Sequence, residues 1–106
     1  MDISDWRKQI DELDRKLVDL LNQRARAAHE IGKLKLKAGM PIYEPDREQK
    51  VFQNARSVNH GPLPDRDLQR IYERIMDIMR HIQQEEIAPE PEKAVRDTEI
   101  ESEINE

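Results

Sequence analysis

Apolar residues in the first third of the chain recur at intervals of three and four, which is the spacing of one face of an α-helix. The pattern predicts a long helix from about Ser4, a residue type common at N-caps, to about Lys37. Gly39 suits the C-cap, and Pro41 prevents continuation of the helix. Such a helix is about 50 Å long, too long for the rest of the chain to cover, so we expect a partner subunit. Its predicted inward apolar positions are Ile10, Leu13, Leu17, Leu20, Leu21, Ala28, Ile31 and Leu34.

Two shorter helices are predicted to follow. Pro45 suits the first position of the second helix, and Asp46 and Glu48 complement its positive end. The segment "NHGPLPD" (59 to 65) predicts a break, after which a third helix runs from Pro64 or Asp65 to Glu86. The predicted fold class is therefore all-α, with three helices per chain. The apolar positions are Val51, Phe52, Ala55 and Val58 on the second helix, and Leu68, Ile71, Tyr72, Ile75, Met76, Ile78, Met79 and Ile82 on the third.

The composition agrees with helices and divides the chain into two parts. Charged residues make up 39% of the 106 residues and aromatics only 4%, which favours helices over strands. Residues 1 to 86 contain sixteen acids and sixteen bases, so the net charge of −5 lies in residues 87 to 106. We therefore expect one helical domain over residues 1–86, followed by a flexible acidic tail over residues 87–106.

Polar residues interrupt the predicted apolar stripes. Arg24 and Lys35 are eleven residues apart on the inward stripe of the first helix, which places them on one face with Cα atoms about 16 Å apart. Gln83 falls on the stripe of Ile75 and Met79. Because a buried cation without an anionic partner is very costly, the pattern predicts a small dianion held between the two cations. The ordinary alternatives are cations that reach the surface or pair with acids, and an amide at a fraying helix end.

Arg7 and Glu48 are further candidates for binding this anion. Arg7 lies about 25 Å along the first helix from Arg24, so the two can share a small ligand only if two long helices pack antiparallel across a twofold axis. Otherwise Arg7 is a surface residue beside Asp11. Glu48 lies near the apolar side of its helix, where a carboxylate can accept a hydrogen bond from a ligand hydroxyl or complement the helix dipole.

Several classes of function are not supported by the sequence. The chain has no cysteine, and His29, His60 and His81 lack metal-ligand spacing, so we expect no metal site. The N-terminus lacks an apolar segment and no run approaches the roughly 20 apolar residues of a membrane span, so a cytoplasmic protein without a membrane partner is expected. Residues 20 to 60 hold eight bases and four acids in a neutral domain, which suits a small anion better than a nucleic acid.

One long segment carries a family resemblance. The stretch "WRKQIDELDRKLVDLLNQRARAAHEIGKLKLKAGMPIYEPDREQKV" contains an Arg, then Ile-Asp-x-Leu-Asp, Leu-Leu-x-x-Arg, Ile-Gly-x-x-Lys and Pro-x-x-x-Pro-x-Arg-Glu. This pattern resembles the all-helical class of chorismate mutases over residues 4 to 86, and "GPLPDRDLQRIYERIMDIMRHIQ" is similar to the third helix of that family. The resemblance implies an intertwined helical homodimer with two equivalent sites, each completed by an arginine from the other subunit.

The resemblance also implies the roles of individual residues. Lys35 corresponds to the lysine that reaches a carboxylate and the ether oxygen of the substrate, Gln83 to a donor to that oxygen, and Arg24 to the main carboxylate clamp. The implied activity is the rearrangement of chorismate to prephenate in aromatic amino acid biosynthesis, an isomerase reaction that uses no cofactor. The other implied substrate-binding residues are Arg7 (donated across the interface), Glu44 (near the substrate hydroxyl), Arg47 (a supporting arginine) and Glu48 (the acceptor for the ring hydroxyl).

One position departs from the family, and two other functions stay open. Met79 stands where many relatives have Ser or another small residue, and a thioether cannot donate a hydrogen bond to a substrate carboxylate. An isochorismate pyruvate-lyase would share this fold and a similar pocket. A non-catalytic dimerisation or regulatory module is the alternative from another class, although such a scaffold would fill the positions of Arg24 and Lys35 with leucine.

Overall fold

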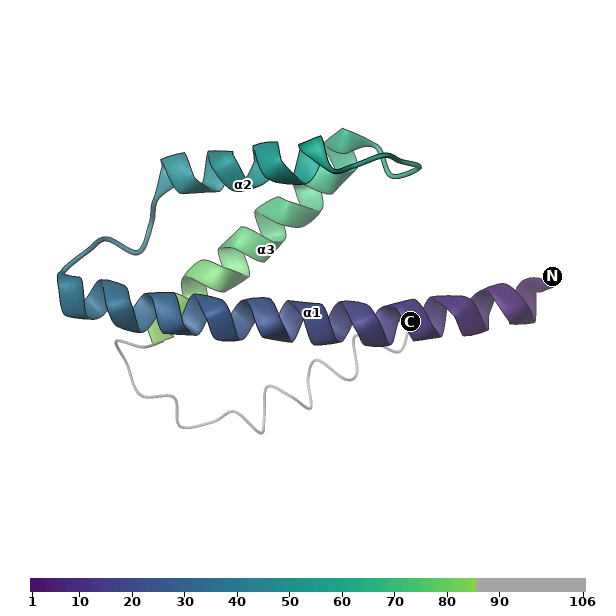
Figure 1. Ribbon diagram of the computed structural model, residues 1–106, viewed down its shortest axis with the longest axis horizontal. Coiled ribbons are helices and arrows are strands. Elements are labelled where there is room, and N and C mark those ends of the chain that lie inside the picture. Colours follow the sequence, from purple (N-terminus) through teal and green to yellow (C-terminus); the bar gives the residue numbers. More distant parts are fainter. Residues whose placement is uncertain (86–106) are drawn as a thin grey trace.

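The computed structural model describes residues 1–85, which form three helices and no strand (Figure 1). Helix α1 spans Ile3–Ala38, α2 spans Pro45–Ser57 and α3 spans Asp65–Glu85. Figure 1 shows α3 running diagonally from the end of α2 to the C-terminal half of α1, while the N-terminal half of α1 projects beyond it. The all-α prediction is therefore confirmed for the described chain. The predicted acidic tail over residues 87–106 lies outside the described residues.

The ends of α1 are set by local hydrogen bonds. Asp2, not Ser4, is the N-cap: its carboxylate accepts from the Asp5 N–H (3.0 Å) and the Asp5 carboxylate accepts from the Asp2 N–H (3.1 Å). This reciprocal capping box satisfies two otherwise unpaired donors, which a serine two residues later could not do. At the other end Gly39 is in the left-handed region (φ 66°), as the C-cap prediction requires.

The connections fix how α2 and α3 enter the fold. Pro45 begins α2, where its missing N–H costs nothing and its φ suits a helix. Between α2 and α3, the Asn59 side-chain amide donates to the Leu63 carbonyl (2.9 Å) and to the Asp65 carboxylate (2.7 Å). These bonds tie the predicted break to the first residue of α3, so the chain reverses direction within a few residues.

Helices α1 and α3 approach each other closely at Gly32. A Cβ atom built on Gly32 would lie 2.9 Å from the Gln83 Cα, a distance that real Cβ atoms essentially never show, and 3.1 Å from the Gln83 carbonyl oxygen, which is also unusually close. The glycine therefore lets the two helix backbones touch at this point. Lys35 lies three residues beyond Gly32 on the same helix, so the contact brings Gln83 beside Lys35.

The core of the described chain is small. Its buried hydrophobic residues are Ala28, Val51, Met76 and Met79. The radius of gyration is 16.5 Å, compared with roughly 12–13 Å for a compact domain of this length. Most apolar positions predicted to face inward on α1 are about half exposed in the single chain, including Ile10, Leu13, Leu17, Leu20, Ile31 and Leu34.

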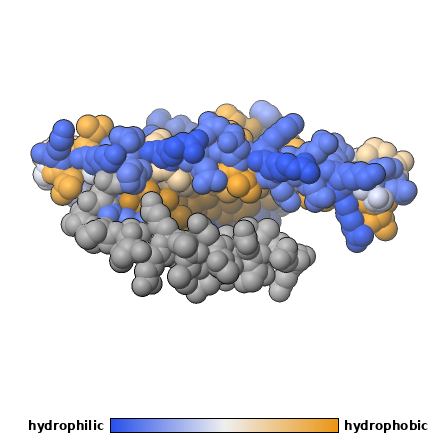
Figure 2. Space-filling model, turned by 90° about the horizontal axis from the view of Figure 1, so that it is seen from below, coloured by the Kyte–Doolittle hydropathy of each residue, from blue (hydrophilic) through white to orange (hydrophobic). Residues whose placement is uncertain are grey.

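The exposed apolar residues continue into a groove. A hollow of about 810 Å³ runs between α1 and α3, lined by Leu17, Leu21, Ile71, Ile75, Ile78 and Ile82 among others. Figure 2 shows hydrophobic surface in a hollow beside the long, mostly hydrophilic edge of the molecule. The exposed apolar residues of α1 and this groove together form a face of the described chain that a second element could cover.

The close approach at Gly32 predicts a specific sensitivity. In Gly32→Ala, the added methyl group forces α3 away from α1, which should lower the free energy of unfolding by about 1–3 kcal/mol. The better helix propensity of alanine offsets roughly 1 kcal/mol of this loss. Thermal unfolding at fixed protein concentration measures the net effect, with Lys33→Ala as the exposed neighbouring control, expected within about 0.5 kcal/mol of wild type. A Gly32→Ala protein that is more stable than the wild type by the roughly 1 kcal/mol expected from helix propensity alone would contradict the described contact.

Candidate functional site

A polar pocket lies where the three helices meet. Its volume is about 490 Å³, which is within the size range of small-molecule sites. The C-terminal half of α1, the start of α2, the preceding loop and the last turns of α3 all contribute to its wall. It is lined by Arg24, Ala27, Ala28, Ile31, Lys35, Ile42, Glu44, Arg47, Glu48, Val51, Met76, Met79, Arg80 and Gln83.

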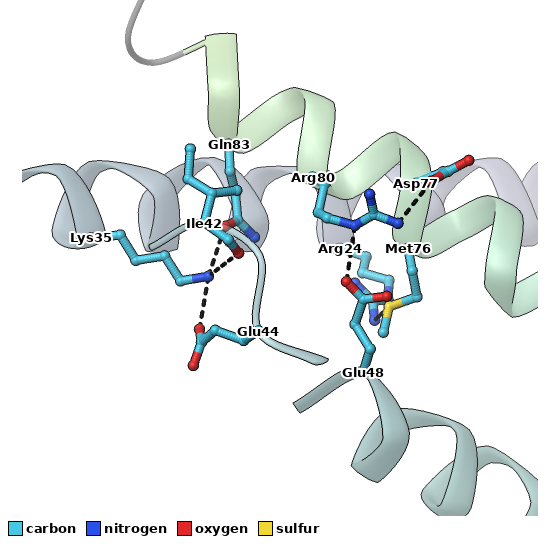
Figure 3. Close-up of polar contacts among 9 residues, drawn as sticks. All are labelled: Arg24, Lys35, Ile42, Glu44, Glu48, Met76, Asp77, Arg80 and Gln83. Carbon is cyan, nitrogen blue, oxygen red and sulfur yellow. Dashed lines mark hydrogen bonds and ion pairs between the residues drawn. The ribbon is translucent and has the colours of Figure 1, made fainter. Parts of the chain in front are cut away.

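Lys35 is the buried cation of this pocket, with 7% of its surface exposed. Its ammonium donates to the Ile42 carbonyl (2.8 Å) and to the Gln83 Oε1 (2.9 Å), and pairs with the Glu44 carboxylate (2.8 Å), as Figure 3 shows. An ammonium group has three N–H donors, and these three acceptors match them. These three acceptors therefore compensate for the burial of the Lys35 ammonium, which helical periodicity predicted to lie on the inward face.

The amide of Gln83 has a fixed orientation. Because an ammonium can only donate, the Gln83 oxygen must be the atom that faces Lys35. The NH2 group on the same side chain is then left to donate to another acceptor. Gln83 thus presents a donor to the pocket from α3, beside the Lys35 donor from α1.

Arg24 reaches the opposite part of the pocket. Its Nη2 lies 3.7 Å from the Met76 sulfur, a weak acceptor that satisfies only a small part of a guanidinium. Arg24 therefore retains the planar set of donors with which arginine binds a carboxylate in a bidentate manner. Figure 3 shows Arg24 and Lys35 on the same side of α3 with the pocket residues between them.

Arg80 holds Glu48 at the pocket wall. Its Nε lies 2.9 Å from the Glu48 Oε2, and its Nη2 lies 2.8 Å from the Asp77 Oδ1. The guanidinium also sits over the Tyr43 ring at 5.2 Å from the centroid. The Glu48 side chain is 19% exposed, so this pair is partly sheltered from solvent screening. Arg80 therefore joins α3 to the start of α2 and to the loop before it.

The pocket carries a net positive charge. Four of its lining residues are bases and two are carboxylates, which leaves a formal charge of +2. The bases are Arg24, Lys35, Arg47 and Arg80, and the carboxylates are Glu44 and Glu48. This charge balances a dianion, and the donors lie on several sides of the cavity.

Six of the seven residues expected to bind substrate line this one pocket: Arg24, Lys35, Glu44, Arg47, Glu48 and Gln83. Arg7 is the exception, since it is exposed on the N-terminal half of α1 and does not line the pocket. The roles of all seven residues stay predictions.

The sequence reasoning missed Arg80. The signal was present, because Met76, Arg80 and Gln83 follow one another at spacings of four and three, and the first and last were recognised as facing inward. Met79, the position that departs from the family pattern, is 6% exposed and lines the same pocket. Its thioether contributes packing there and no hydrogen-bond donor.

The described chain offers neither a metal-binding cluster nor a helix that could span a membrane. Within residues 1–85 there is no group of three or more His, Cys, Asp or Glu side chains that could hold a metal ion. No helix in the same range is long and apolar enough to cross a bilayer.

Three helices around a cationic pocket, with a buried lysine in contact with a half-buried glutamine, place the chain in the class of small all-helical ligand-binding proteins. Comparison with known proteins identifies the family. Residues 6–84 match the model of the family "Chorismate mutase type II". The match spans well over half of the chain and includes every predicted site residue. The chain therefore belongs to the type II chorismate mutase family.

A curated relative shows how this domain is used elsewhere. The chain is 37% identical over 79 residues to a bifunctional chorismate mutase/prephenate dehydratase of Aquifex aeolicus, which covers 71% of this chain. The same alignment covers 22% of that relative, so the chain spans about a fifth of the length of such curated relatives.

Solved structures share the fold. A chorismate mutase of Thermus thermophilus superposes with a TM-score of 0.76 at 30% identity, covering 77% of this chain and 93% of that one. A chorismate mutase of Helicobacter pylori, solved in complex with prephenate, gives a TM-score of 0.75 at 29% identity, covering 84% of this chain and 97% of that one. The three-helix architecture described here is thus an established one in the family.

Proposed function

We propose that this protein is a chorismate mutase that rearranges chorismate to prephenate. The observation that carries the proposal is the contact between Lys35 and Gln83, which lie 48 residues apart in the sequence and meet at the wall of a pocket with a formal charge of +2. Chorismate is a dianion whose ether bond breaks during the rearrangement. Its binding site therefore needs cations for the two carboxylates and hydrogen-bond donors for the ether oxygen. The family membership and the prephenate bound to the Helicobacter relative support the same substrate class.

The reaction is a unimolecular pericyclic shift, so the site need not supply a nucleophile or a base. Binding the folded conformer removes most of the entropic cost of reaching the transition state. In this proposal Arg24 and Arg47 hold carboxylates, and Glu48 accepts from the ring hydroxyl. Lys35 and the NH2 group of Gln83 stabilise the negative charge that develops on the ether oxygen as its bond breaks.

Substrate binding must rearrange the contacts of Lys35. Its three donors already have three acceptors, so a substrate oxygen can approach only if one acceptor gives way. Ile42 offers a backbone carbonyl, and Gln83 is held against Gly32. Glu44 has a side chain that is 39% exposed, so water can solvate it when it moves. We therefore infer that Glu44 releases Lys35 when substrate binds and turns towards the substrate hydroxyl.

We also propose that the protein is an intertwined homodimer in which Arg7 completes the pocket of the partner. The exposed apolar residues of α1 and the groove between α1 and α3 form a surface that the long helix of a second copy could cover. A helix packed there antiparallel would carry its Arg7 towards the other pocket. This additional arginine adds to the attraction of the pocket for the dianion.

The direct test is to incubate the protein with chorismate and measure prephenate. Wild type should form prephenate, and Lys35→Ala should lower kcat/KM by about 100-fold or more, since it removes the charged donor to the ether oxygen. Lys33→Ala, which changes an exposed lysine two residues away, is the matched control and should keep wild-type activity. Incubation with isochorismate tests the lyase alternative, for which the product would be salicylate. Formation of salicylate without prephenate would contradict the assignment as a chorismate mutase.

Replacing Gln83 by Glu predicts a change in the pH profile. A carboxylate at this position can accept from Lys35 but donates to the ether oxygen only when protonated. Because the neighbouring ammonium favours the ionised form, activity of Gln83→Glu should rise as pH falls, with an optimum below that of wild type. Measuring kcat/KM from pH 4 to 9 checks this, and a profile that matches the wild type would argue against donation from Gln83.

A two-variant heterodimer tests whether Arg7 acts across the interface. Arg7→Ala and Lys35→Ala chains carrying different tags are co-expressed and purified on both tags. If Arg7 serves the partner, one pocket of each heterodimer combines an intact Lys35 with an intact Arg7, and specific activity returns to about half that of wild type. If Arg7 serves its own chain, both pockets lack one residue and no activity returns. The two homodimeric variants are the controls.

A further inference from the structure

Arg80 has contacts that the proposed chemistry does not explain. It lines the pocket from α3, and its side chain is 32% exposed. It donates from Nε to Glu48 on α2 and from Nη2 to Asp77 on its own helix (Figure 3). The face of its guanidinium covers the ring of Tyr43. Three neighbours therefore fix the plane of this guanidinium. A side chain held this firmly at a pocket wall is suited to orienting another group.

We propose that Arg80 is the positioning residue for Glu48 and thereby sets the affinity for the ring hydroxyl of the substrate. This inference rests on the proposed function. Arg80 occupies one oxygen of the Glu48 carboxylate, Oε2, at 2.9 Å. The second oxygen can still accept from a ligand in the pocket. Without Arg80, the Glu48 side chain would be free to sample several rotamers, and part of the binding energy would be lost in ordering it.

Asp77 and Tyr43 explain why this residue is an arginine. The Asp77 carboxylate lies three residues earlier on α3 and holds Nη2, so Nε points across to α2. The planar guanidinium can donate in two directions and stack on a ring at the same time. A lysine could pair with Glu48 as a point charge, but it could not keep the other two contacts. The orientation of Glu48 thus depends on a residue that need not touch substrate.

The test is a double-mutant cycle measured on chorismate. Arg80→Met removes the charge while keeping much of the volume, and Glu48→Ala removes the group that Arg80 is proposed to orient. Because a hydroxyl contact is made in both the ground state and the transition state, Arg80→Met should raise KM about 10- to 100-fold and change kcat less than about fivefold. In the Glu48→Ala background, adding Arg80→Met should change kcat/KM by less than about threefold.

Three further proteins complete the design. Arg66→Met changes an exposed arginine in the first turns of α3 and should behave as wild type. Arg80→Lys should give a KM between those of wild type and Arg80→Met. If Arg80→Met does not fold, the double-mutant cycle with Glu48→Ala is measured with Arg80→Lys in its place. Asp77→Asn keeps Arg80 and loosens it, so KM should rise by a smaller factor than in Arg80→Met.

The outcomes separate this inference from the proposed function. Additive losses from Arg80→Met and Glu48→Ala in an active protein would overturn the positioning role and leave the mutase activity standing. A fall in kcat with KM unchanged would also overturn it, since Arg80 would then act on the transition state itself. If wild type forms no prephenate, both proposals fail. Non-additivity in KM, with Arg66→Met unaffected, supports the assignment.

Discussion

The contact between α1 and α3 at Gly32 determines most of the site. It brings the Gln83 backbone within 3.1 Å of where a Cβ atom on Gly32 would be, and a side chain at position 32 would prevent it. With the helices this close, the Lys35 ammonium reaches the Gln83 oxygen at 2.9 Å. A buried lysine would otherwise have to lose its charge or its burial. One missing side chain therefore allows two polar groups from distant parts of the chain to share a pocket wall.

The same long helix explains why the single chain is incomplete. The C-terminal half of α1 provides Arg24 and Lys35, and its N-terminal half projects from the fold with apolar residues about half exposed. A monomer would leave this surface in water at a cost of roughly 25 cal/mol for each Å² of apolar area. In the proposed dimer, the association of two chains covers this surface and at the same time brings Arg7 of each chain to the pocket of the other. Folding and assembly of the active site are then coupled.

Local patterns in the sequence predicted the helices and most of the pocket, but they could not predict its cross-helix pairs. Helical periodicity placed Arg24 and Lys35 on one inward face, and Gly39 and Pro45 marked helix ends correctly. Periodicity describes one helix at a time, so it gave no reason to pair Arg80 with Glu48, which lies 32 residues away. The N-cap is Asp2 and not the predicted Ser4, because Asp2 and Asp5 form two reciprocal hydrogen bonds that Ser4 cannot form with Arg7.

The charge balance of the pocket explains why an amide suits position 83. The lining residues have a formal charge of +2, which a dianion would neutralise. An ionised carboxylate at this position would reduce the charge to +1. It would place a second anion beside the ether oxygen of the substrate as we propose it to bind. It would also compete with Glu44 for Lys35. A neutral amide accepts from Lys35 and donates to the pocket without changing the charge. The interruption of an apolar helix face by Gln83 therefore follows from the electrostatics of a site built for an anion.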